Sequence, residues 1–279
     1  MLSAILSDQA QMSKIKEWNE RYLHWDELRF RADDDKALEI WAIMKILRSN
    51  GLNIIDVCGL NLKYNLLSDF QELLHHIDRD PAGFVNLKNP GEKSVRTYAI
   101  SSLMEEAIAS SQMEGAATTR KDAKKMLRIQ RKPNNISELM IYNNYLAMEH
   151  IKSTLDRKMD PDLILQMHKT ITNGTFSEGS EWEGRFREDN ETVVGDTNRE
   201  EVIFHVPPEY DLIPGLIQEL CDFINDDEEF VHPIIKGIMV HYLIGYIHPF
   251  VNGNGRLARS LYYWYVMKKG YWLMEYTSI

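Results

Sequence analysis

The chain has 279 residues, of which 44% are hydrophobic and 27% charged, and this composition argues against an intrinsically disordered protein. Its 42 acidic and 32 basic residues give a net charge of −10, which argues against the basic face that non-specific nucleic-acid binding needs. No run approaches the roughly 18 apolar residues of a membrane span, and the N-terminus does not resemble a secretory signal. We therefore expect a cytoplasmic protein with no nucleic-acid or membrane partner.

Most of the chain shows the apolar spacing of amphipathic helices. Three aspartates at 33–35 precede apolar residues at three- and four-residue steps, and Asn50-Gly51 close the segment. This pattern predicts a helix that ends near Leu47. The same periodicity predicts further helices over about 60–77, 95–113, 119–130, 136–155 and 160–172.

Helical periodicity stops between residues 174 and 208. Two short segments in this interval, 191–195 and 201–206, have the character of strands. The residues between them, 196–200, are polar and turn-like. We predict a β-hairpin here.

Helices resume over about 210–225 and 232–247, the second with Pro233 in a favoured first-turn position. A last helix is predicted to begin near residue 254 and to end around 269–270. The long connection at 81–93 is the candidate domain boundary. The predicted domains are an N-terminal helical region, residues 1–90, and a second domain, residues 91–279.

The run from His248 to Arg259, between the last two predicted helices, has the chemistry of an anion-binding loop. Its glycines let backbone N–H groups turn toward a ligand, and the following helix N-terminus adds unpaired donors. Arg256 and Arg259 are three residues apart, so we expect both guanidinium groups on one side of the first helical turn, as suits a polyphosphate. The neutral imidazole of His248 would accept a hydroxyl proton beside it. The alternative is a tight turn with solvated side chains.

This run, His-Pro-Phe-Val-Asn-Gly-Asn-Gly-Arg-Leu-Ala-Arg, resembles the signature His-x-Phe-x-(Asp/Glu)-Gly-Asn-Gly-Arg-x-x-Arg of the Fic family and matches eight of its nine defined positions. The similarity extends upstream to Gly184-Arg185-Phe186-Arg187, Val206-Pro207-Pro208 and His232-Pro233. It covers about residues 135–270, the expected Fic core. The resemblance implies a mainly α protein: a Fic-type helical bundle with one β-hairpin flap and an additional N-terminal helical region.

In that family the histidine is the general base that activates a Ser, Thr or Tyr hydroxyl of a protein, and AMP is commonly transferred from ATP while pyrophosphate leaves. The resemblance implies that His248 is this catalytic base, that Phe250 anchors the loop, and that ATP and Mg²⁺ are bound. A protein with a hydroxyl side chain is the implied partner, and self-modification and a homodimer remain open. The implied nucleotide-binding residues are Gly253, Asn254, Gly255, Arg256 and Arg259, the last at the γ-phosphate.

The predicted hairpin is similar to the family's flap, on which an extended target segment lies. The resemblance implies that Val193, Val194 and Gly195 dock this segment by main-chain pairing. The alternative is that a two-stranded hairpin covers one end of the bundle and has no other role.

A second short match begins at Ser110 and ends at Glu114-Gly115. It resembles the family's inhibitory motif, (Ser/Thr)-x-x-x-Glu-(Gly/Asn), in which the glutamate binds the second arginine of the loop. The resemblance implies an inhibitory helix near residues 95–115, with Glu114 paired to Arg259 and competing with the γ-phosphate. Taken alone, Glu-Gly is also a common helix end.

The sequence departs from the family at Asn252, where an Asp or Glu usually coordinates magnesium. A neutral carbonyl oxygen is a weaker ligand for this hard cation, so Asn252 is a weak metal candidate. The favoured function is an autoinhibited protein adenylyltransferase. The departure leaves as alternatives a nucleotide-binding sensor or interaction protein with weak or no transfer, removal of AMP, and another phosphate-containing donor. His75, His76 and His168 are interpreted as surface or satisfied core histidines.

Overall fold

The computed structural model describes residues 7–33, 36–49, 51–79, 92–176, 179–196 and 199–271. The chain divides into two compact units, Met1–Asp80 and Pro81–Ile279. Among the helices in these described ranges, none has both the length and the apolar character needed to cross a bilayer.

The first unit has a small helical core of its own. Its elements are α2 (Gln9–Glu20), α3 (Trp25–Leu28), α4 (Ala37–Ser49), β1 (Asn53–Val57), β2 (Leu60–Tyr64) and α5 (Ser68–Arg79). Apolar side chains of α2, α3 and α4 pack together, as their three- and four-residue spacing requires. The buried members of this cluster are Ile15, Leu23, Leu28, Ile40, Ile43 and Met44.

The prediction of one helix over 60–77 is wrong in its first part. Residues 53–64 form an antiparallel hairpin, with Asn53 opposite Tyr64 and Val57 opposite Leu60. Cys58 and Gly59 both have positive φ, 53° and 69°, which is the geometry of a tight hairpin turn. The alternation of apolar and polar residues from Leu60 to Tyr64 has a period of two, which favours a strand over a helix.

The second unit is mainly helical and contains the other hairpin, which confirms the predicted mainly α fold. Its first elements are α6 (Glu92–Met113), α7 (Arg120–Arg128), α8 (Ile136–Thr154) and α9 (Pro161–Thr172). The hairpin is β3 (Val194–Asp196) with β4 (Arg199–His205), and residues 197 and 198 of its predicted turn lie outside the described ranges. The last elements are η1 (Tyr210–Leu212), α10 (Ile213–Asn225), α11 (Pro233–Ile247) and α12 (Asn254–Lys268).

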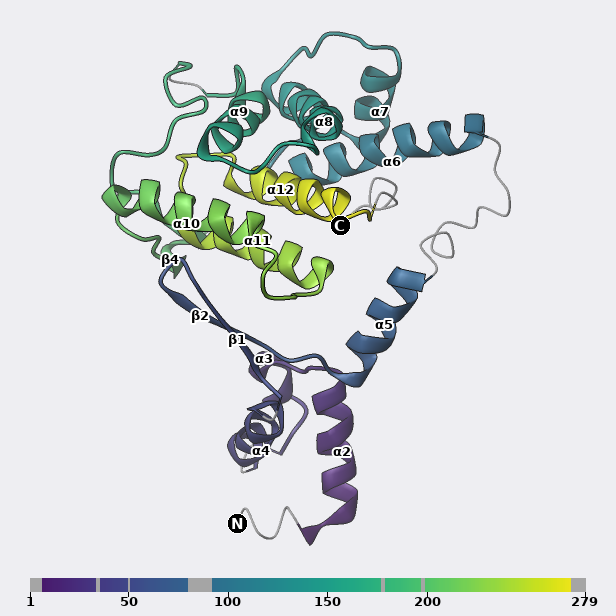
Figure 1. Ribbon diagram of the computed structural model, residues 1–279, viewed down its shortest axis with the longest axis vertical. Coiled ribbons are helices and arrows are strands. Elements are labelled where there is room, and N and C mark those ends of the chain that lie inside the picture. The colour runs from purple at the N-terminus through teal and green to yellow at the C-terminus, as the bar shows by residue number, and fades with distance from the viewer. Residues whose placement is uncertain are drawn as a thin grey trace. The chain divides into compact units, whose positions relative to one another are not determined.

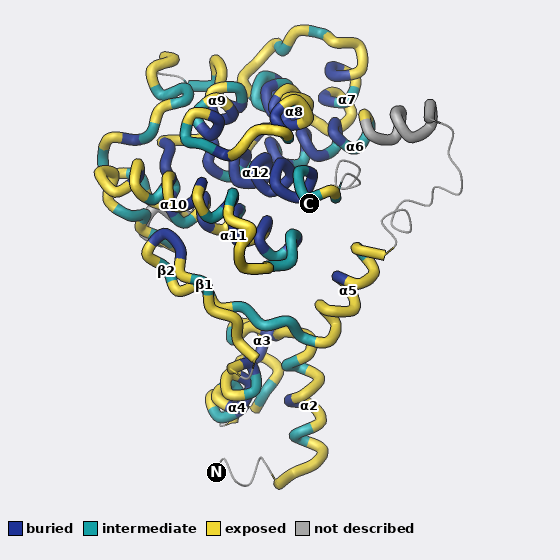
Figure 2. The backbone as a smooth tube through the Cα atoms, viewed as in Figure 1, coloured by how far each residue is buried: buried dark blue, intermediate teal, exposed yellow. Residues whose placement is uncertain are grey.

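Helix α12 is the centre of the second unit. It packs against α11, α8, α9 and α6, which surround it in Figure 1. Every residue from Arg256 to Met267 is buried, so α12 is the dark blue helix inside the unit in Figure 2. A helix buried on all sides is held firmly by its neighbours, and its first turn is therefore a rigid place for a binding loop.

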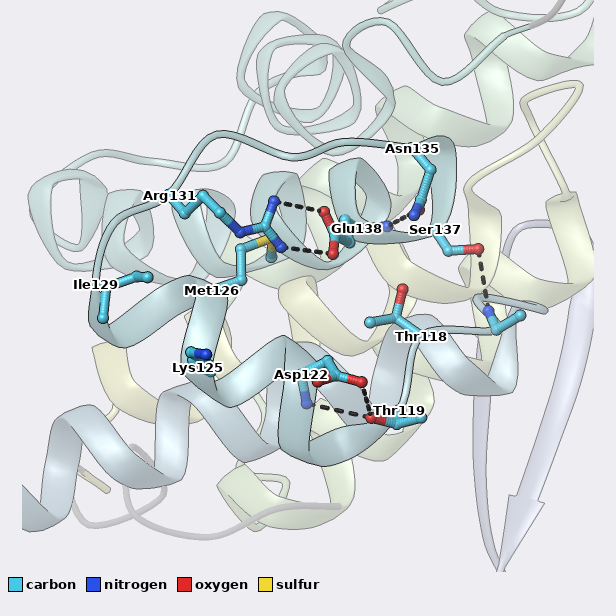
Figure 3. A pocket seen from close by; sticks show the side chains of 11 residues that line it. Thr118, Thr119, Asp122, Lys125, Met126, Ile129, Arg131, Asn135, Ser137 and Glu138 are labelled. Atoms are coloured by element: carbon cyan, nitrogen blue, oxygen red, sulfur yellow. Dashed lines mark hydrogen bonds and ion pairs between the residues drawn. The ribbon is translucent and has the colours of Figure 1, made fainter.

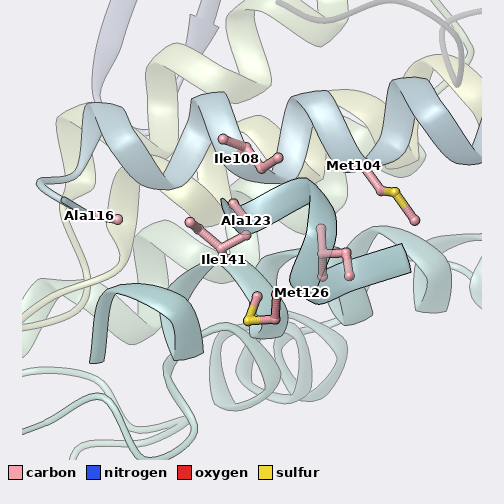
Figure 4. Packing of buried hydrophobic residues seen from close by; sticks show 7 residues of the cluster. Met104, Ile108, Ala116, Ala123, Met126 and Ile141 are labelled. Atoms are coloured by element: carbon pink, nitrogen blue, oxygen red, sulfur yellow. The ribbon is translucent and has the colours of Figure 1, made fainter. Parts of the chain in front are cut away.

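Helix α6 is fixed by a hydrophobic cluster that it shares with α7 and α8. Ile108 of α6 and Ile141 of α8 are fully buried in this cluster, together with Ala123 of α7 (Figure 4). The other buried members are Met104, Ala116, Met126 and Leu127. The cluster fixes the C-terminal end of α6, where Glu114 follows the helix.

Candidate active site

His248 ends α11 in an uncommon backbone conformation. Its φ of 46° and ψ of 58° lie in the left-handed region, and its N–H donates to the Ile244 carbonyl at 2.9 Å. A non-glycine residue in this region costs on the order of 1–3 kcal/mol, and such residues cluster at functional sites. The half-buried imidazole is thus directed by a strained turn at the end of a buried helix.

The surroundings of His248 keep its imidazole neutral. Burial lowers the pKa of His248, the carbonyl of Gly245 opposes this shift, and the Arg187 cation adds to it. Its Nδ1 is buried and makes no hydrogen bond of normal geometry to any residue in the described ranges. A neutral imidazole at pH 7 can accept a proton, as the predicted general base must.

The loop after His248 is closed by Asn254, whose side chain binds both backbone groups of Phe250. Oδ1 accepts from the Phe250 N–H at 3.0 Å, and Nδ2 donates to the Phe250 carbonyl at 2.7 Å. Gly253 caps α12 with a φ of 85°, and a Cβ there would lie 2.8 Å from Thr172 Cγ2. Since this amide is used within the loop, a phosphate contact of Asn254 would come from its backbone N–H.

His168 of α9 supports the same loop from below. Its Nε2 donates to the Asn252 carbonyl at 2.8 Å, and its Nδ1 accepts from the Gly184 N–H at 3.0 Å. The ring stacks on Phe250 at 3.6 Å with an interplanar angle of 8°. Burial lowers the pKa of His168 to about 4, because protonation would place a charge in the core and a second hydrogen beside the Gly184 N–H.

The two arginines of the loop do not emerge together, contrary to the expectation from their spacing. Arg256 is 1% exposed and turns toward α9, where its Nη1 donates to the Ile171 carbonyl at 3.1 Å. Its Nε is buried and has no hydrogen-bond partner among the described residues, and burial lowers the pKa of the Arg256 guanidinium to about 10. Arg259 turns toward α6 instead. The difference arises because α12 is buried on all sides, so its side chains follow the neighbouring helices.

Arg259 is held by the end of α6. Its Nε donates to the Ser110 hydroxyl at 2.7 Å and its Nη2 to the Ser110 carbonyl at 2.9 Å. The same Nη2 lies 2.7 Å from Glu114 Oε1. The structure thus brings together Ser110, Glu114 and Arg259, which lie about 145 residues apart in the sequence.

The Glu114 carboxylate also lies directly against the start of α12. A Cβ on Gly255 would be only 2.1 Å from Glu114 Oε1, so the close approach requires glycine at 255. Within the part of the chain that the structure describes, no side-chain hydrogen bond caps this helix N-terminus. The Glu114 carboxylate oxygen therefore lies between the start of α12 and Arg259, at the position where the sequence predicts a phosphate.

Asn252 lies in the loop with its side chain turned back on the backbone. Its Oδ1 accepts from the Gly253 N–H at 2.6 Å. Among the residues that the structure describes, no group of three or more His, Cys, Asp or Glu is placed to hold a metal ion. One of the two lone pairs of the Asn252 Oδ1 is thus used within the loop, and this neutral oxygen is a weaker ligand for Mg²⁺ than a carboxylate.

The predicted docking residues lie at the start of the flap hairpin. Val193 precedes β3 and is 43% exposed, whereas Val194 pairs with His205 and Gly195 with Ile203. A Cβ on Gly195 would approach the Val202 carbonyl to 2.9 Å, so the irregular register there needs glycine. The described sheet has two strands, which leaves the outer edge of β3 without a strand partner.

A cavity of about 580 Å³ lies elsewhere, beside α7 and the start of α8 (Figure 3). In its wall Arg131 binds both carboxylate oxygens of Glu138, at 3.0 and 2.6 Å. The Ser137 hydroxyl accepts from the Ala117 N–H at 3.0 Å, which fixes the segment that follows Glu114. No loop residue from 248 to 259 lines this cavity, so the cavity is separate from the candidate active site at the loop.

Comparison with known proteins matches the part of the chain that contains this loop. The sequence matches the Fic/DOC family over residues 158–266, from the start of α9 to α12. This chain carries a Fic domain. Two similar curated proteins, both named protein adenylyltransferase Fic, come from Drosophila willistoni and Drosophila virilis. They are 32% and 33% identical over 130 residues, which cover 45% of this chain.

The match spans about a quarter of these relatives, 24% of their length. The fold of the Fic domain and its flanks also recurs in solved structures. A fragment of Fic-1 from C. elegans has a TM-score of 0.61 at 18% identity, covering 94% of this chain and 70% of the other. A Fic family protein from Desulfovibrio desulfuricans G20 has a TM-score of 0.58 at 20% identity, covering 76% and 63%.

Sequence reasoning missed three residues that shape the site of this Fic domain. His168 is a satisfied core histidine, as expected, but its role in supporting the loop was not predicted. Arg187 donates to the His248 carbonyl at 3.0 Å, and His205 donates to the Tyr246 carbonyl at 2.7 Å. Their partners lie 41 to 84 residues away, so no local spacing signals the contacts.

Proposed function

We propose that this Fic family protein transfers AMP from ATP to a hydroxyl side chain of a protein. The observation that carries the proposal is the position of His248, a neutral and half-buried imidazole directly before a helix start that accommodates an anion. The names of the curated relatives support the same reaction. Their activity is extended here to a chain that matches a quarter of their length.

The helix start has the chemistry that a nucleotide phosphate requires. The Glu114 carboxylate lies against Gly255 and binds Arg259, so this position already favours negative oxygen. The buried Nε of Arg256 has no partner in the described structure and is a further donor nearby. A phosphate that replaced the carboxylate would find the same donors, with the α12 dipole favouring its charge.

In the proposed reaction the hydroxyl oxygen of the target attacks the α-phosphorus of ATP. A new oxygen–phosphorus bond forms, and the bond from the α-phosphorus to the bridging oxygen of pyrophosphate breaks. The hydroxyl proton passes to the imidazole of His248, and pyrophosphate leaves with the bonding electron pair. A pKa of His248 below its ordinary value keeps the base neutral before the reaction.

Glu114 acts as a brake in this proposal. Its carboxylate uses the Nη2 donor of Arg259 that the γ-phosphate would need. Ser110 supports the brake, because its hydroxyl and carbonyl bind the same guanidinium. ATP then binds productively only when Glu114 leaves Arg259.

The flap supplies the target in an extended form. The outer edge of β3 lacks a strand partner in the described sheet, and main-chain pairing there would hold a target segment next to His248. Val193, Val194 and Gly195 are the docking residues in this proposal. Backbone pairing gives register with little sequence selectivity, which suits modification of more than one hydroxyl.

The residues around Asn252 do not form a magnesium site by themselves, and this favours a second candidate function. Its Oδ1 is used by the Gly253 N–H, and no carboxylate stands at this position. A loop that binds a nucleotide with weak metal support would serve a sensor or interaction protein that transfers slowly or not at all. The two functions make different predictions for the same experiment.

Intact-mass measurement after incubation with ATP and Mg²⁺, alone and with candidate proteins, tests the proposal. We expect the mass of an AMP group on the protein or its partner, more of it in Glu114→Gly, and none in His248→Ala. Each other nucleoside triphosphate is tested in turn to identify the donor. ATP binding to Glu114→Gly without any added mass would contradict transfer and support the sensor.

A further inference from the structure

Arg187 is a buried cation that binds the backbone on the His248 side of the site. The residue is 2% exposed and follows α9 in the segment after Gly184. Its Nε donates to the His248 carbonyl at 3.0 Å, and its backbone N–H donates to the Pro249 carbonyl at 2.9 Å. Two successive carbonyls of the strained turn are therefore held by one residue.

The other end of the same guanidinium binds the segment that precedes β3 and the segment that follows β4. On the β3 side, Nη1 donates to the Asp189 carbonyl at 2.6 Å and to Asn190 Oδ1 at 3.4 Å. On the β4 side, Nη2 donates to the Pro208 carbonyl. Asn190 Oδ1 also accepts from the Tyr210 N–H at 2.8 Å, and this hydrogen bond joins the segment before β3 to the segment after β4.

The hydrogen-bond partners of Arg187 are unusual for a buried cation. The acceptors are backbone carbonyls and one amide oxygen, and within the described residues none of these hydrogen bonds goes to a carboxylate. Burial lowers the pKa of the Arg187 guanidinium, and the charge of Asp189 opposes this shift. Burying a cation that is hydrogen-bonded to no anion costs free energy, so a contribution to stability does not explain Arg187 well. Its planar guanidinium does suit the joining of several fixed carbonyls.

We propose that Arg187 is a positioning residue. It holds the His248 turn and the two segments that flank the β3–β4 flap in one fixed arrangement. His205 of β4 adds a second contact between the flap and α11, because its Nε2 donates to the carbonyl of Tyr246, two residues before His248. A segment docked on the flap then meets the imidazole in constant register. A role of this arrangement in AMP transfer rests on the proposed function. The arrangement itself can be tested by measurements that need no transfer.

The test compares Arg187→Met and Arg187→Lys with the same changes at Arg185. Arg185 lies two residues away, is exposed, and binds Glu188 at 2.5 Å. It therefore controls for a change of arginine in this segment. Methionine removes the charge and the fork, whereas lysine keeps a charge but cannot bind carbonyls on both sides at once.

Hydrogen exchange and the titration of His248 by NMR are the two measurements. In both Arg187 variants we expect the amides of β3, β4 and the His248 turn to exchange about tenfold faster or more. Arg187, His205 and Glu114 are the charged or titratable groups that face His248. Arg187→Met should raise the pKa of His248, and Arg187→Lys should keep it low.

The Arg185 variants should match the parent protein in both measurements. Unchanged flap exchange in folded Arg187→Met, or equal effects of the Arg185 changes, would overturn the proposal. Loss of folding in both Arg187 variants would also overturn it, because Arg187 would then be a residue of the core. If the variants show the exchange and titration effects but the protein never transfers AMP, the proposed function is contradicted and this inference is still supported.

Discussion

At the scale of single residues, the pKa of His248 determines when the site can accept a proton. A base works in its neutral form, and burial lowers the pKa of this imidazole below the ordinary value near 6.5. Transfer should therefore rise with pH through a midpoint below about 6.5 and be level at pH 7. Rates of AMP transfer by Glu114→Gly between pH 4.5 and 8 give this midpoint. A midpoint above the ordinary imidazole value would contradict the burial argument.

His248→Ala is the companion prediction at the same position. Transfer should fall about 10²- to 10⁴-fold, because the hydroxyl loses its base. ATP affinity should stay nearly constant, since the phosphate donors belong to the start of α12. Calorimetric ATP binding, measured beside the transfer rate, separates the two effects. A similar loss of both would show that His248 supports the loop rather than the chemistry.

Asn252 is the one position where the loop departs from its family. In Asn252→Asp, one carboxylate oxygen would keep the bond from the Gly253 N–H, and the second would be open to Mg²⁺. We expect tighter Mg²⁺ binding in the presence of ATP, and faster transfer at limiting Mg²⁺ when Glu114→Gly is also present. Magnesium titrations of the double variant measure both, with Asn252→Ala as the control. Unchanged metal affinity would remove residue 252 from the metal site.

At the scale of elements, the close contact between the end of α6 and the start of α12 is testable by a double-mutant cycle. Gly255→Ala places a Cβ on the Glu114 carboxylate, so it should break the Arg259 ion pair and destabilise the protein by about 1–3 kcal/mol. In Glu114→Ala the same change should be neutral or stabilising by up to about 1 kcal/mol, since alanine favours helix. Urea unfolding of the four proteins gives the coupling energy.

The cycle also separates geometry from function, because it needs no nucleotide. Ser110→Ala serves as a control, since it removes a hydroxyl from Arg259 without touching Gly255. Additive effects of Gly255→Ala and Glu114→Ala would mean that the carboxylate does not lie on the helix start.

At the scale of the whole molecule, the buried His168 links the loop to the stability of its unit. Its pKa is about 4 in the folded protein and near 6.5 when unfolded, so between these values the unfolded chain binds more protons. The free energy of unfolding should fall as pH decreases from about 6.5 to 4, by up to about 3 kcal/mol from this residue. His168→Gln keeps a donor for the Asn252 carbonyl but does not titrate.

Urea unfolding of the parent and His168→Gln across this pH range gives the contribution as a difference. The stability gap between the two proteins should shrink as the pH falls. A constant gap would show that His168 is not buried in its neutral form.

Local chemistry predicted most of the helices and the loop. The apolar spacing of α8 and α9, the Asp160-Pro161 start of α9 and the glycines at the start of α12 act over a few residues, so they can be identified without a fold. The hairpin at 53–64 was missed because its apolar positions, among them Leu60, Leu62 and Tyr64, were counted with those of the helix that follows. A period of two over five residues is easily hidden by a longer helical pattern.

The tertiary structure alone decided how the site is held together. Whether Arg256 turns to α9 and Arg259 to α6 depends on which helices surround α12, and their spacing of three residues does not contain this information. The same holds for His168 beneath the loop and Arg187 between the flap and His248. Sequence patterns express the preferences of neighbouring residues along one helix or strand, whereas a buried donor takes whichever carbonyl the packing of distant segments brings within reach.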